Sequence, residues 1–214
     1  MVKSMKTPLK NKSSKVFYWC LMVIILPIAW ILFLPRIKGR KKIPKGGAIF
    51  AGNHIRSLDS VMILVAIWRP LQFLSKIEIF SWPVIGWLVK RLNMIPVDRK
   101  AVGKNSGAID AAVAYLNQDK SVGIFPEGTA KKPRNELLPF KFGAVKMAQK
   151  SGKIIVPFAI YGHYWPFCHT INVVIGEPID ISGLEITEAN ELLRNQIAGL
   201  LTNNGQKIIV KGDK

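Results

Sequence analysis

The chain has 214 residues, a length that suits one domain with an appended segment. Apolar residues make up 49% of it and the mean hydropathy is +0.21, which is high for a soluble protein and draws attention to a membrane segment. The net charge of +18 attracts anionic partners: lipid headgroups, phosphorylated small molecules, acidic carrier proteins or nucleic acid. Two cysteines exclude a disulfide framework and favour a reducing, cytoplasm-facing environment.

The N-terminal part is hydrophobic between two basic flanks. Residues 16–34 are nineteen positions without a charge, about the length that crosses ~30 Å of hydrocarbon. We expect a retained membrane anchor, because Pro35 and Arg36 follow where a signal peptide would have a small-residue cleavage site. Residues 1–45 hold eleven basic residues and no acidic one, so the positive-inside rule gives no orientation. Pro27 leaves two alternatives open: one kinked span, or a helix pair that dips into one leaflet and returns.

After this segment, short apolar runs alternate with helical patterns, which predicts an α/β domain with a covered, mainly parallel sheet. Strands are expected at residues 48–52, 71–75, 94–97, 122–125, 154–160 and 171–175. Helices are expected at residues 57–68, 79–92, 107–116, 140–150 and from 187 onward, with Thr187 as the N-cap of the last one.

His54 and Asp59 are the first candidates for catalysis. A five-residue offset places side chains on opposite faces of a strand, or about 140° apart on a helix, so the pair meets only if the chain turns between them. The predicted strand ends near Asn53 and the predicted helix begins near Ser57, which supplies such a turn. His54 would then take a proton from a hydroxyl while Asp59 orients the imidazole and stabilises its cation. The alternative is a surface histidine and an aspartate that favours a helix N-terminus.

The loop Phe-Pro-Glu-Gly-Thr at residues 125–129 is the second candidate, because it follows a predicted strand, where ligands bind in α/β sheets. Lys131, Lys132 and Arg134 come next. A glycine-containing loop with nearby cations is suited to hold a phosphate through backbone N–H groups and charge. A plain turn with solvated lysines is the alternative, and the loop lacks the signature of a nucleotide-binding P-loop.

Arg99 is the third candidate, since a guanidinium clamps a phosphate with two hydrogen bonds; a surface arginine is the alternative. The apolar run that contains Val156 and Pro157 is expected to be a core strand. No metal-binding cluster is expected, and His163 and His169 are interpreted as structural. The sequence has no serine-centred elbow, so a covalent serine mechanism is not indicated.

Together, these motifs resemble the lysophosphatidic acid acyltransferase family, the 1-acyl-glycerol-3-phosphate acyltransferase group within the glycerolipid acyltransferase superfamily. The resemblance covers roughly residues 45–180, and its motifs are weak singly but specific in combination. The family's Asn-His, four residues and Asp are similar to Asn53, His54 and Asp59; its Val-x-Arg is similar to Val97 and Arg99; its Phe-Pro-Glu-Gly-Thr is similar to residues 125–129; and its Val-Pro is similar to Val156 and Pro157.

The resemblance implies a mixed, mainly parallel sheet flanked by helices, with an N-terminal helical membrane element. It implies that His54 is the general base, that Asp59 orients it, and that the acceptor hydroxyl attacks an acyl thioester without an acyl-enzyme. It also implies a substrate-binding set, which we assign to Arg99, Glu127, Gly128, Thr129 and Lys131.

Two features depart from the family or from simple charge logic. Ala130 stands where family members often have arginine, so Lys131, Lys132 or Arg134 is expected to supply the charge. Glu127 is an anion in an expected phosphate site. Our hypothesis is that it accepts hydrogen bonds from Arg99 or from backbone donors and fixes the loop.

Residues 1–44 are therefore expected to be a membrane anchor and residues 45–214 an acyltransferase domain. The expected reaction moves an acyl chain from acyl-CoA or acyl carrier protein to the sn-2 hydroxyl of lysophosphatidic acid, giving phosphatidic acid without a cofactor or metal. We expect it at the cell membrane, facing the cytoplasm, with membrane lipids and not nucleic acid as partners. The alternatives are another acceptor, such as glycerol-3-phosphate or another lysophospholipid, and a non-catalytic basic protein that binds membranes or nucleic acid.

Overall fold

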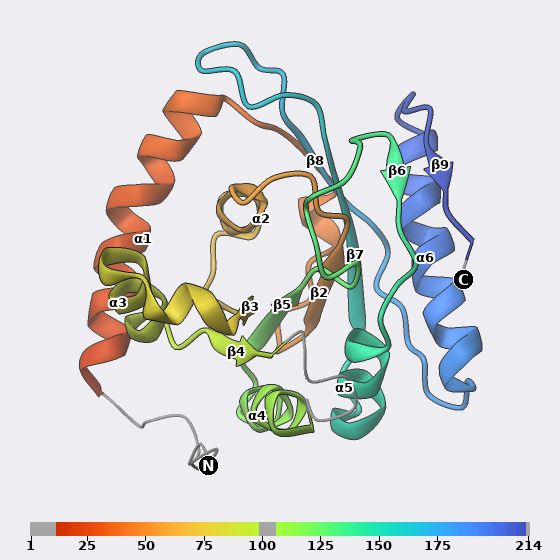
Figure 1. Ribbon diagram of the computed structural model, residues 1–214, viewed down its shortest axis with the longest axis horizontal. Coiled ribbons are helices and arrows are strands. Elements are labelled where there is room, and N and C mark those ends of the chain that lie inside the picture. The colour runs from red at the N-terminus through yellow and green to blue at the C-terminus, as the bar shows by residue number, and fades with distance from the viewer. Residues whose placement is uncertain (1–11, 99–105, 213–214) are drawn as a thin grey trace.

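The computed structural model describes residues 12–98 and 106–212. A seven-stranded sheet runs through the molecule in the order β1-β8-β7-β2-β5-β3-β4 (Figure 1). Neighbouring strands are parallel except β7 and β8, which are antiparallel. The expected mixed, mainly parallel sheet is thus confirmed. Its strands are β1 (Arg36–Lys38), β2 (Ile49–Gly52), β3 (Leu71–Lys76), β4 (Ile95–Val97), β5 (Ser121–Ile124), β7 (Ile155–Tyr161) and β8 (Asn172–Ile175).

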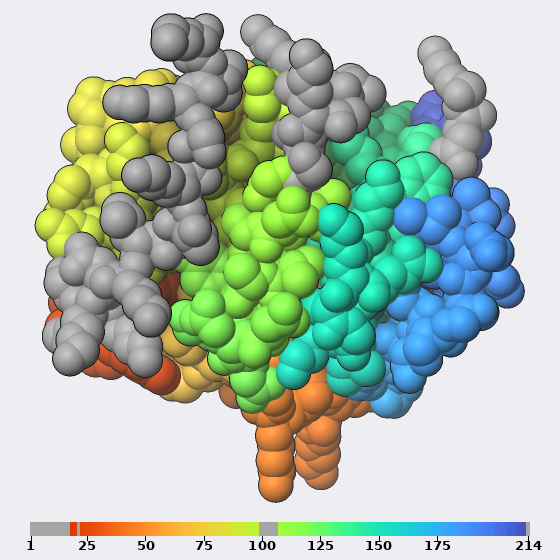
Figure 2. All heavy atoms as spheres, turned by 90° about the horizontal axis from the view of Figure 1, so that it is seen from below, coloured from red at the N-terminus to blue at the C-terminus, as the bar shows by residue number. Residues whose placement is uncertain are grey.

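Helices cover both faces of this sheet, and a small two-stranded sheet lies beside it. The helices are α1 (Lys12–Phe33), α2 (Asp59–Ile67), α3 (Pro83–Arg91), α4 (Ser106–Leu116), α5 (Gly143–Ser151) and α6 (Ile186–Thr202), with short 3₁₀ turns η1 (Arg40–Lys42) and η2 (Ile77–Ser81). The small sheet pairs β6 (Glu136–Leu137) with β9 (Ile209–Val210). Figure 2 shows α4, α5 and α6 side by side on one face of the molecule.

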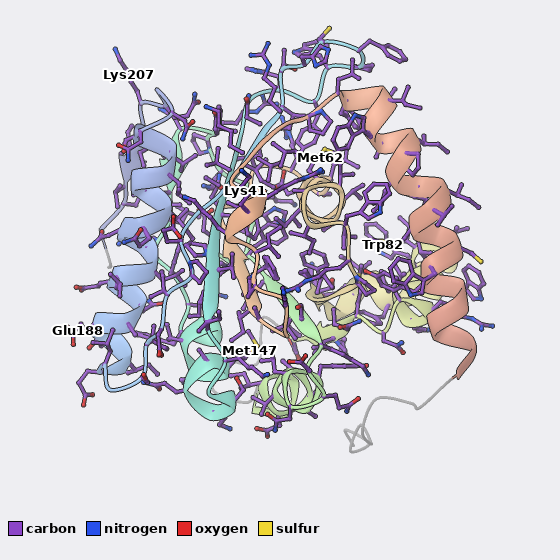
Figure 3. The ribbon with its side chains drawn as sticks, turned by 180° about the vertical axis from the view of Figure 1, so that it is seen from behind. Lys41, Met62, Trp82, Met147, Glu188 and Lys207 are labelled. Atoms are coloured by element: carbon purple, nitrogen blue, oxygen red, sulfur yellow. The ribbon has the colours of Figure 1, made fainter. Side chains whose placement is uncertain are left out.

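Alternate residues of the central strands belong to two different hydrophobic cores. Phe50 of β2 and Phe158 of β7 pack with α1 and α2, whereas Ile49 and Ala159 pack with α4, α5 and α6. Met62 of α2 and Met147 of α5 are fully buried in the first and the second core respectively (Figure 3). Because both faces of the strands are covered, their sequences read as continuous apolar runs rather than as alternating ones.

The predicted elements are found close to their expected positions, with a few differences that have local causes. The helix expected at residues 79–92 begins only at Pro83, because proline lacks the backbone N–H and suits the first helical turn. Thr187 is not the N-cap of α6, since the helix already begins at Ile186. The strands β1, β6 and β9 were not predicted.

The N-terminal segment differs most from expectation. α1 is one continuous helix through Pro27, so the alternative of a helix pair is wrong. One face of α1 is buried in the core beside α2 through residues at helical spacing: Tyr18, Met22, Leu26, Ala29 and Phe33. In the described part of the chain, no helix is both long and apolar enough to cross a membrane, so the expected spanning anchor is not confirmed.

The sheet also begins before the boundary that we expected at residue 45. β1 lies within residues 1–44, yet it forms the edge strand next to β8. Gly39 follows it with a φ of 82° and its backbone packs against the carbonyl of Ile175. Residues of the expected anchor therefore belong to the same packed unit as the rest of the described chain.

Candidate active site

The candidate site lies where the three central strands end. β2 is flanked by β5 and β7, all parallel, so the loops that follow these strands open at the same edge of the sheet. The buried amide of Asn53, directly after β2, donates to the carbonyl of Ile160 and accepts its N–H, each at 2.8 Å. At Gly52, a Cβ would stand 2.3 Å from the ring of Phe158. These contacts fix the end of β2 against β7.

The turn expected between His54 and Asp59 is present, because α2 begins at Asp59. Nδ1 of His54 lies 2.7 Å from Oδ2 of Asp59. The same oxygen accepts the backbone N–H groups of Ile55 at 2.6 Å and Arg56 at 2.8 Å, so Oδ2 acts as an acceptor and we assign the shared proton to Nδ1. Nε2 then carries the lone pair that a general base requires.

The imidazole of His54 is held from a second side by an aromatic ring. Phe125, the first residue after β5, stacks on it with ring centroids 4.2 Å apart and an interplanar angle of 13°. Only 15% of the His54 side chain is exposed. The imidazole is therefore fixed between a carboxylate and a phenyl ring, while a small part of it remains exposed.

Tyr164 is a site residue that the sequence did not reveal. It follows β7, and its hydroxyl donates to Oδ1 of Asp59 at 2.5 Å. Burial, and secondarily the charge of Asp59, raise the pKa of Tyr164, so the phenol stays protonated and remains a donor. Its ring packs edge-on against Phe33 of α1, with centroids 5.5 Å apart. The fully buried Asp59 thus has hydrogen bonds on both oxygens.

Glu127 is buried, and its carboxylate accepts hydrogen bonds from groups of the protein itself. Oε1 accepts the backbone N–H of His54 at 2.9 Å, and Oε2 accepts the N–H of Leu138 at 2.9 Å. Lys132 lies 2.6 Å from Oε2, with side-chain exposures of 3% for the lysine and 0% for the glutamate. The backbone donors of our hypothesis are therefore present. Any contribution of Glu127 to substrate binding passes through the positions of His54 and Lys132.

The other predicted substrate ligands are placed less closely around the histidine. Gly128 has a φ of 72°, and the side chain of Lys141 lies against it, within 3.2 Å of where a Cβ would stand. Thr129 accepts the N–H of Lys131 at 3.0 Å, and the Lys131 side chain is exposed. Arg99 lies outside the described residues. Lys141 was not predicted, because nothing in its run of sequence marks it as a neighbour of the glycine loop.

Residues 35–161, more than half of the chain, match the acyltransferase family. The chain belongs to this family.

Curated relatives agree with that assignment, and a solved structure shares the fold. The chain is 30% identical over 151 residues to the 1-acyl-sn-glycerol-3-phosphate acyltransferase of Borreliella burgdorferi, covering 70% of this chain and 57% of the relative. It is 31% identical over 129 residues to the enzyme of the same name from Bacillus subtilis, covering 59% and 62%. The crystal structure of the 1-acyl-sn-glycerophosphate acyltransferase PlsC from Thermotoga maritima shares the fold, with a TM-score of 0.70, 22% identity, and coverage of 96% of this chain and 86% of that chain. The match spans less than two thirds of either curated relative.

An acyltransferase must seat an acceptor beside its base, and a pocket of about 400 Å³ adjoins Tyr164. Arg56, Arg134 and Trp165 are among the residues that line it. In the described ranges, no group of three or more His, Cys, Asp or Glu side chains is placed to hold a metal ion.

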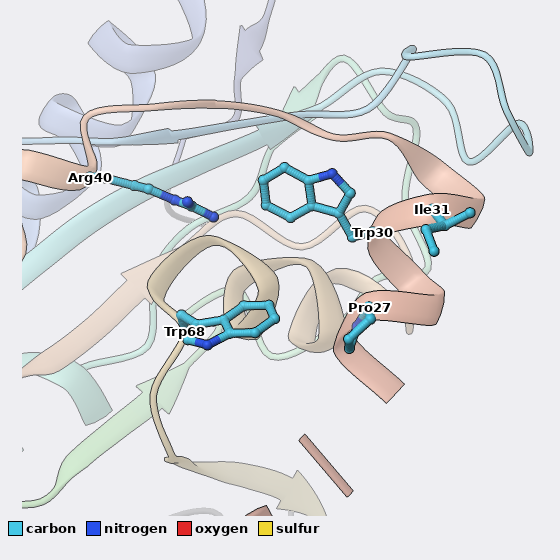
Figure 4. Close-up of a pocket in the computed structure, with 5 residues that line it drawn as sticks. All are labelled: Pro27, Trp30, Ile31, Arg40 and Trp68. Atoms are coloured by element: carbon cyan, nitrogen blue, oxygen red, sulfur yellow. The ribbon is translucent and has the colours of Figure 1, made fainter. Parts of the chain in front are cut away.

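A second pocket of about 400 Å³ lies between α1 and the end of α2 (Figure 4). Trp30 and Trp68 line it, and the guanidinium of Arg40 lies over the Trp30 ring at 5.1 Å from its centroid. Arg40 also donates to the carbonyl of Val65 at 2.9 Å. The pocket thus pairs tryptophans with one cation, and it contains none of the residues of the histidine–aspartate pair.

Proposed function

We propose that this acyltransferase moves a fatty acyl chain from an acyl thioester to the free sn-2 hydroxyl of lysophosphatidic acid, which gives phosphatidic acid. The observation that carries the proposal is the 2.7 Å contact between His54 Nδ1 and Asp59 Oδ2, which leaves Nε2 available as a base. The names of the relatives support lysophosphatidic acid as the acceptor, and the chain's +18 charge is compatible with an anionic one.

The mechanism follows from the assignment of a proton to Nδ1 of His54. Nε2 of His54 removes the proton of the acceptor hydroxyl as its oxygen attacks the thioester carbonyl carbon. The imidazolium that forms is stabilised by Asp59, whose carboxylate is in turn held by Tyr164 and two backbone N–H groups. When the tetrahedral intermediate collapses, the C–S bond breaks and the imidazolium returns its proton to the leaving thiolate. The products are an ester and a free thiol, and the enzyme ends in its starting protonation state.

The donor in this proposal is acyl-CoA or acyl carrier protein, and the basic surface is compatible with both. The two donors share the phosphopantetheine thioester, so the step at His54 is the same for each. The catalytic step needs no redox chemistry, and the proposal includes no cofactor.

We also propose that the protein is held at the cytoplasmic face of the cell membrane, with lipid in contact with α1 and α3. Figure 3 shows Trp82, the residue before α3, near α1, and the two helices contact each other. Exposed tryptophans and aliphatic side chains next to a basic segment suit a membrane interface. Among the described side chains, the large exposed apolar residues of these helices and of the N-cap of α3 are Trp19, Val23, Ile24, Ile28, Ile31, Trp82, Val84, Ile85 and Trp87.

Flotation with vesicles of anionic phospholipid tests this placement. Replacing Ile24 and Ile28 by serine, both on the exposed face of α1, should reduce the fraction of protein that floats with the vesicles while its thermal stability is kept. Unchanged flotation of a folded double variant would contradict contact through α1. Protease access from the two sides of the membrane tests the cytoplasmic orientation separately.

The reaction is tested with the purified full chain in detergent, lysophosphatidic acid, and acyl-CoA or acyl carrier protein, with phosphatidic acid as the measured product. We expect turnover that His54→Ala abolishes. His169→Ala is the matched control, because His169 is exposed and the one hydrogen bond of its side chain within the described residues is to the carbonyl of Leu34. If the wild type fails with both donors, lysophosphatidic acid is not the acceptor, and glycerol-3-phosphate and other lysophospholipids are then supplied in its place.

A further inference from the structure

Trp68 has a backbone conformation that a bulky side chain does not favour. It ends α2 with a φ of 53° and a ψ of 38°, in the left-handed region where helices commonly have glycine. Its side chain is not required to fill the core either, because the residue is 50% exposed. Neither backbone preference nor burial explains the tryptophan. A role in the pocket that it lines, between α1 and the end of α2, would explain it.

Arg40 brings a positive charge to the same pocket (Figure 4). Its guanidinium is positioned by the carbonyl of Val65 at 2.9 Å and by the ring of Trp30, whose centroid is 5.1 Å away. In the described part of the chain, that carbonyl is its one hydrogen-bond acceptor, so most of its N–H donors remain for a ligand. None of the residues that line the pocket is acidic. Capping the last turn of α2 is the structural alternative for Arg40, but it does not account for Trp68.

The pocket joins an apolar surface to a basic one. Ile31 lines it, is 61% exposed, and continues the outer face of α1 for which we propose lipid contact. Arg40 belongs to residues 36–45, which contain six basic residues and no acidic one. A ligand with acyl chains and an anionic head matches both surfaces. The charge of Arg40 also opposes a quaternary ammonium, the other kind of headgroup that tryptophans bind.

We propose that this pocket binds the headgroup of an anionic phospholipid of the membrane, with the phosphate at Arg40 and the glycerol beside Trp30 and Trp68. The proposal depends on the proposed contact of α1 with lipid. The volume of about 400 Å³ suits a headgroup, and tryptophans are enriched at the depth where headgroups lie. α2 extends from Asp59 to Ile67, about 12 Å at 1.5 Å per residue. The bound lipid is therefore separate from the substrates at the catalytic pair and is not consumed.

The experiment measures the binding of phosphatidylglycerol and of phosphatidylcholine to the purified full chain in neutral detergent, by native mass spectrometry. Arg40→Gln and Trp68→Gly are compared with wild type. Lys41→Gln is the matched control, because it removes the same charge from the next residue, which is exposed and does not line the pocket. Trp68→Gly separates binding from folding: glycine favours the left-handed backbone, so the Tm should stay near wild type while the pocket loses a wall.

We expect Arg40→Gln to weaken the binding of phosphatidylglycerol by about tenfold, the lower end of the range for a hydrogen bond to a charged group. Trp68→Gly should weaken it by about fivefold, through the loss of an aromatic contact. Lys41→Gln should stay near wild type, and phosphatidylcholine should bind wild type more weakly and respond little to Arg40→Gln. The KM values for lysophosphatidic acid and for both acyl donors should not change in any variant.

Three results would overturn the lipid site. Equal losses in Arg40→Gln and Lys41→Gln, or equal binding of the two lipids by wild type, would show unspecific attraction to the basic segment. A lower Tm of Arg40→Gln with unchanged lipid binding would leave Arg40 as a cap of α2 alone. A raised KM for acyl-CoA in Arg40→Gln would place the phosphates of the donor in the pocket. Because lipid binding in detergent requires neither turnover nor flotation, failure of the proposed reaction or of the proposed membrane placement would be seen separately.

Discussion

Replacing Glu127 by glutamine tests whether this glutamate organises the site from within the protein. The three groups around its carboxylate, which are the N–H of His54, the N–H of Leu138 and the ammonium of Lys132, are all hydrogen-bond donors. A glutamine in either orientation turns its own NH₂ toward at least one of these donors. It also leaves the ammonium of Lys132, at 3% exposure, without a counter-charge.

The expected destabilisation is about 3–5 kcal/mol, the usual result of removing one partner of a buried ion pair. For a domain of this length, that corresponds to a fall in Tm of roughly 6–20 °C. Turnover should fall as well, because the backbone of His54 loses the acceptor that holds it. Tryptophan fluorescence at a fixed heating rate gives the apparent Tm, and phosphatidic acid formation gives the rate.

A double-mutant cycle identifies the cause. Lys132→Met alone should also destabilise, because it leaves a buried carboxylate unpaired, whereas the double variant should lose less than the sum of both by roughly 1–3 kcal/mol. Glu177→Gln is the control, because Glu177 is 74% exposed in its pair with Lys42 and such surface pairs contribute little. A Glu127→Gln protein with full activity and a Tm within about 2 °C of wild type would refute the reasoning.

Three further predictions concern the residues behind the base and the first helix. Asp59→Asn should lower kcat by about 10³–10⁴-fold, because an amide no longer fixes the Nδ1–H tautomer of His54. A loss below tenfold in the rate of phosphatidic acid formation would argue against His54 as the base and Asp59 as the residue that orients it. Tyr164→Phe should lower kcat by about 10-fold or more and the free energy of unfolding by about 1–3 kcal/mol, since the buried Asp59 loses one charge-assisted hydrogen bond. The raised pKa of Tyr164 makes this effect constant over neutral and moderately alkaline pH, and steady-state rates across that range check it. Burial raises the pKa of Tyr18 to about 12 from 10.0. Its neutral form therefore stabilises the fold below pH 10, and this stability, up to roughly 2–3 kcal/mol, is lost as pH rises toward 12. Tyr18→Phe should flatten the fall of Tm between pH 10 and 12, and an unchanged slope would contradict this prediction.

Much of the fold could be predicted because its strands are buried on both faces. Runs such as β2 and β7 are apolar at nearly every position, which marks them clearly in the sequence. β1 could not be predicted, because Arg36 and Lys38 flank a single isoleucine and only its pairing with β8 makes it a strand. The spanning anchor expected in the N-terminal segment is not confirmed for a related reason: the segment is hydrophobic, but one face of α1 packs in the core beside α2. A count of apolar residues does not distinguish a face buried in protein from a face that meets lipid.

The candidate site was predictable where neighbours in sequence are also neighbours in space. His54 and Asp59 are five residues apart, and a strand-to-helix turn is enough to join them. Tyr164 is 105 residues from Asp59, and only the return of β7 to the centre of the sheet brings them together. The motif likewise indicated that Glu127 belongs to the site, but not that Lys132 forms a buried ion pair with it. Which cation is left for a ligand depends on such pairings, and these follow from packing rather than from local pattern.

The contact between Phe33 and Tyr164 connects the first helix to the residues of the candidate site. α1 offers its outer side chains to the surroundings, while the end of its inner face supports the tyrosine that holds the catalytic aspartate. Removing this helix to obtain a more tractable enzyme would therefore remove support for the candidate site along with the surface for which we propose lipid contact. A truncated protein that proved inactive would not reveal which of these losses mattered. Substitutions confined to the outer face are the means of separating attachment from catalysis.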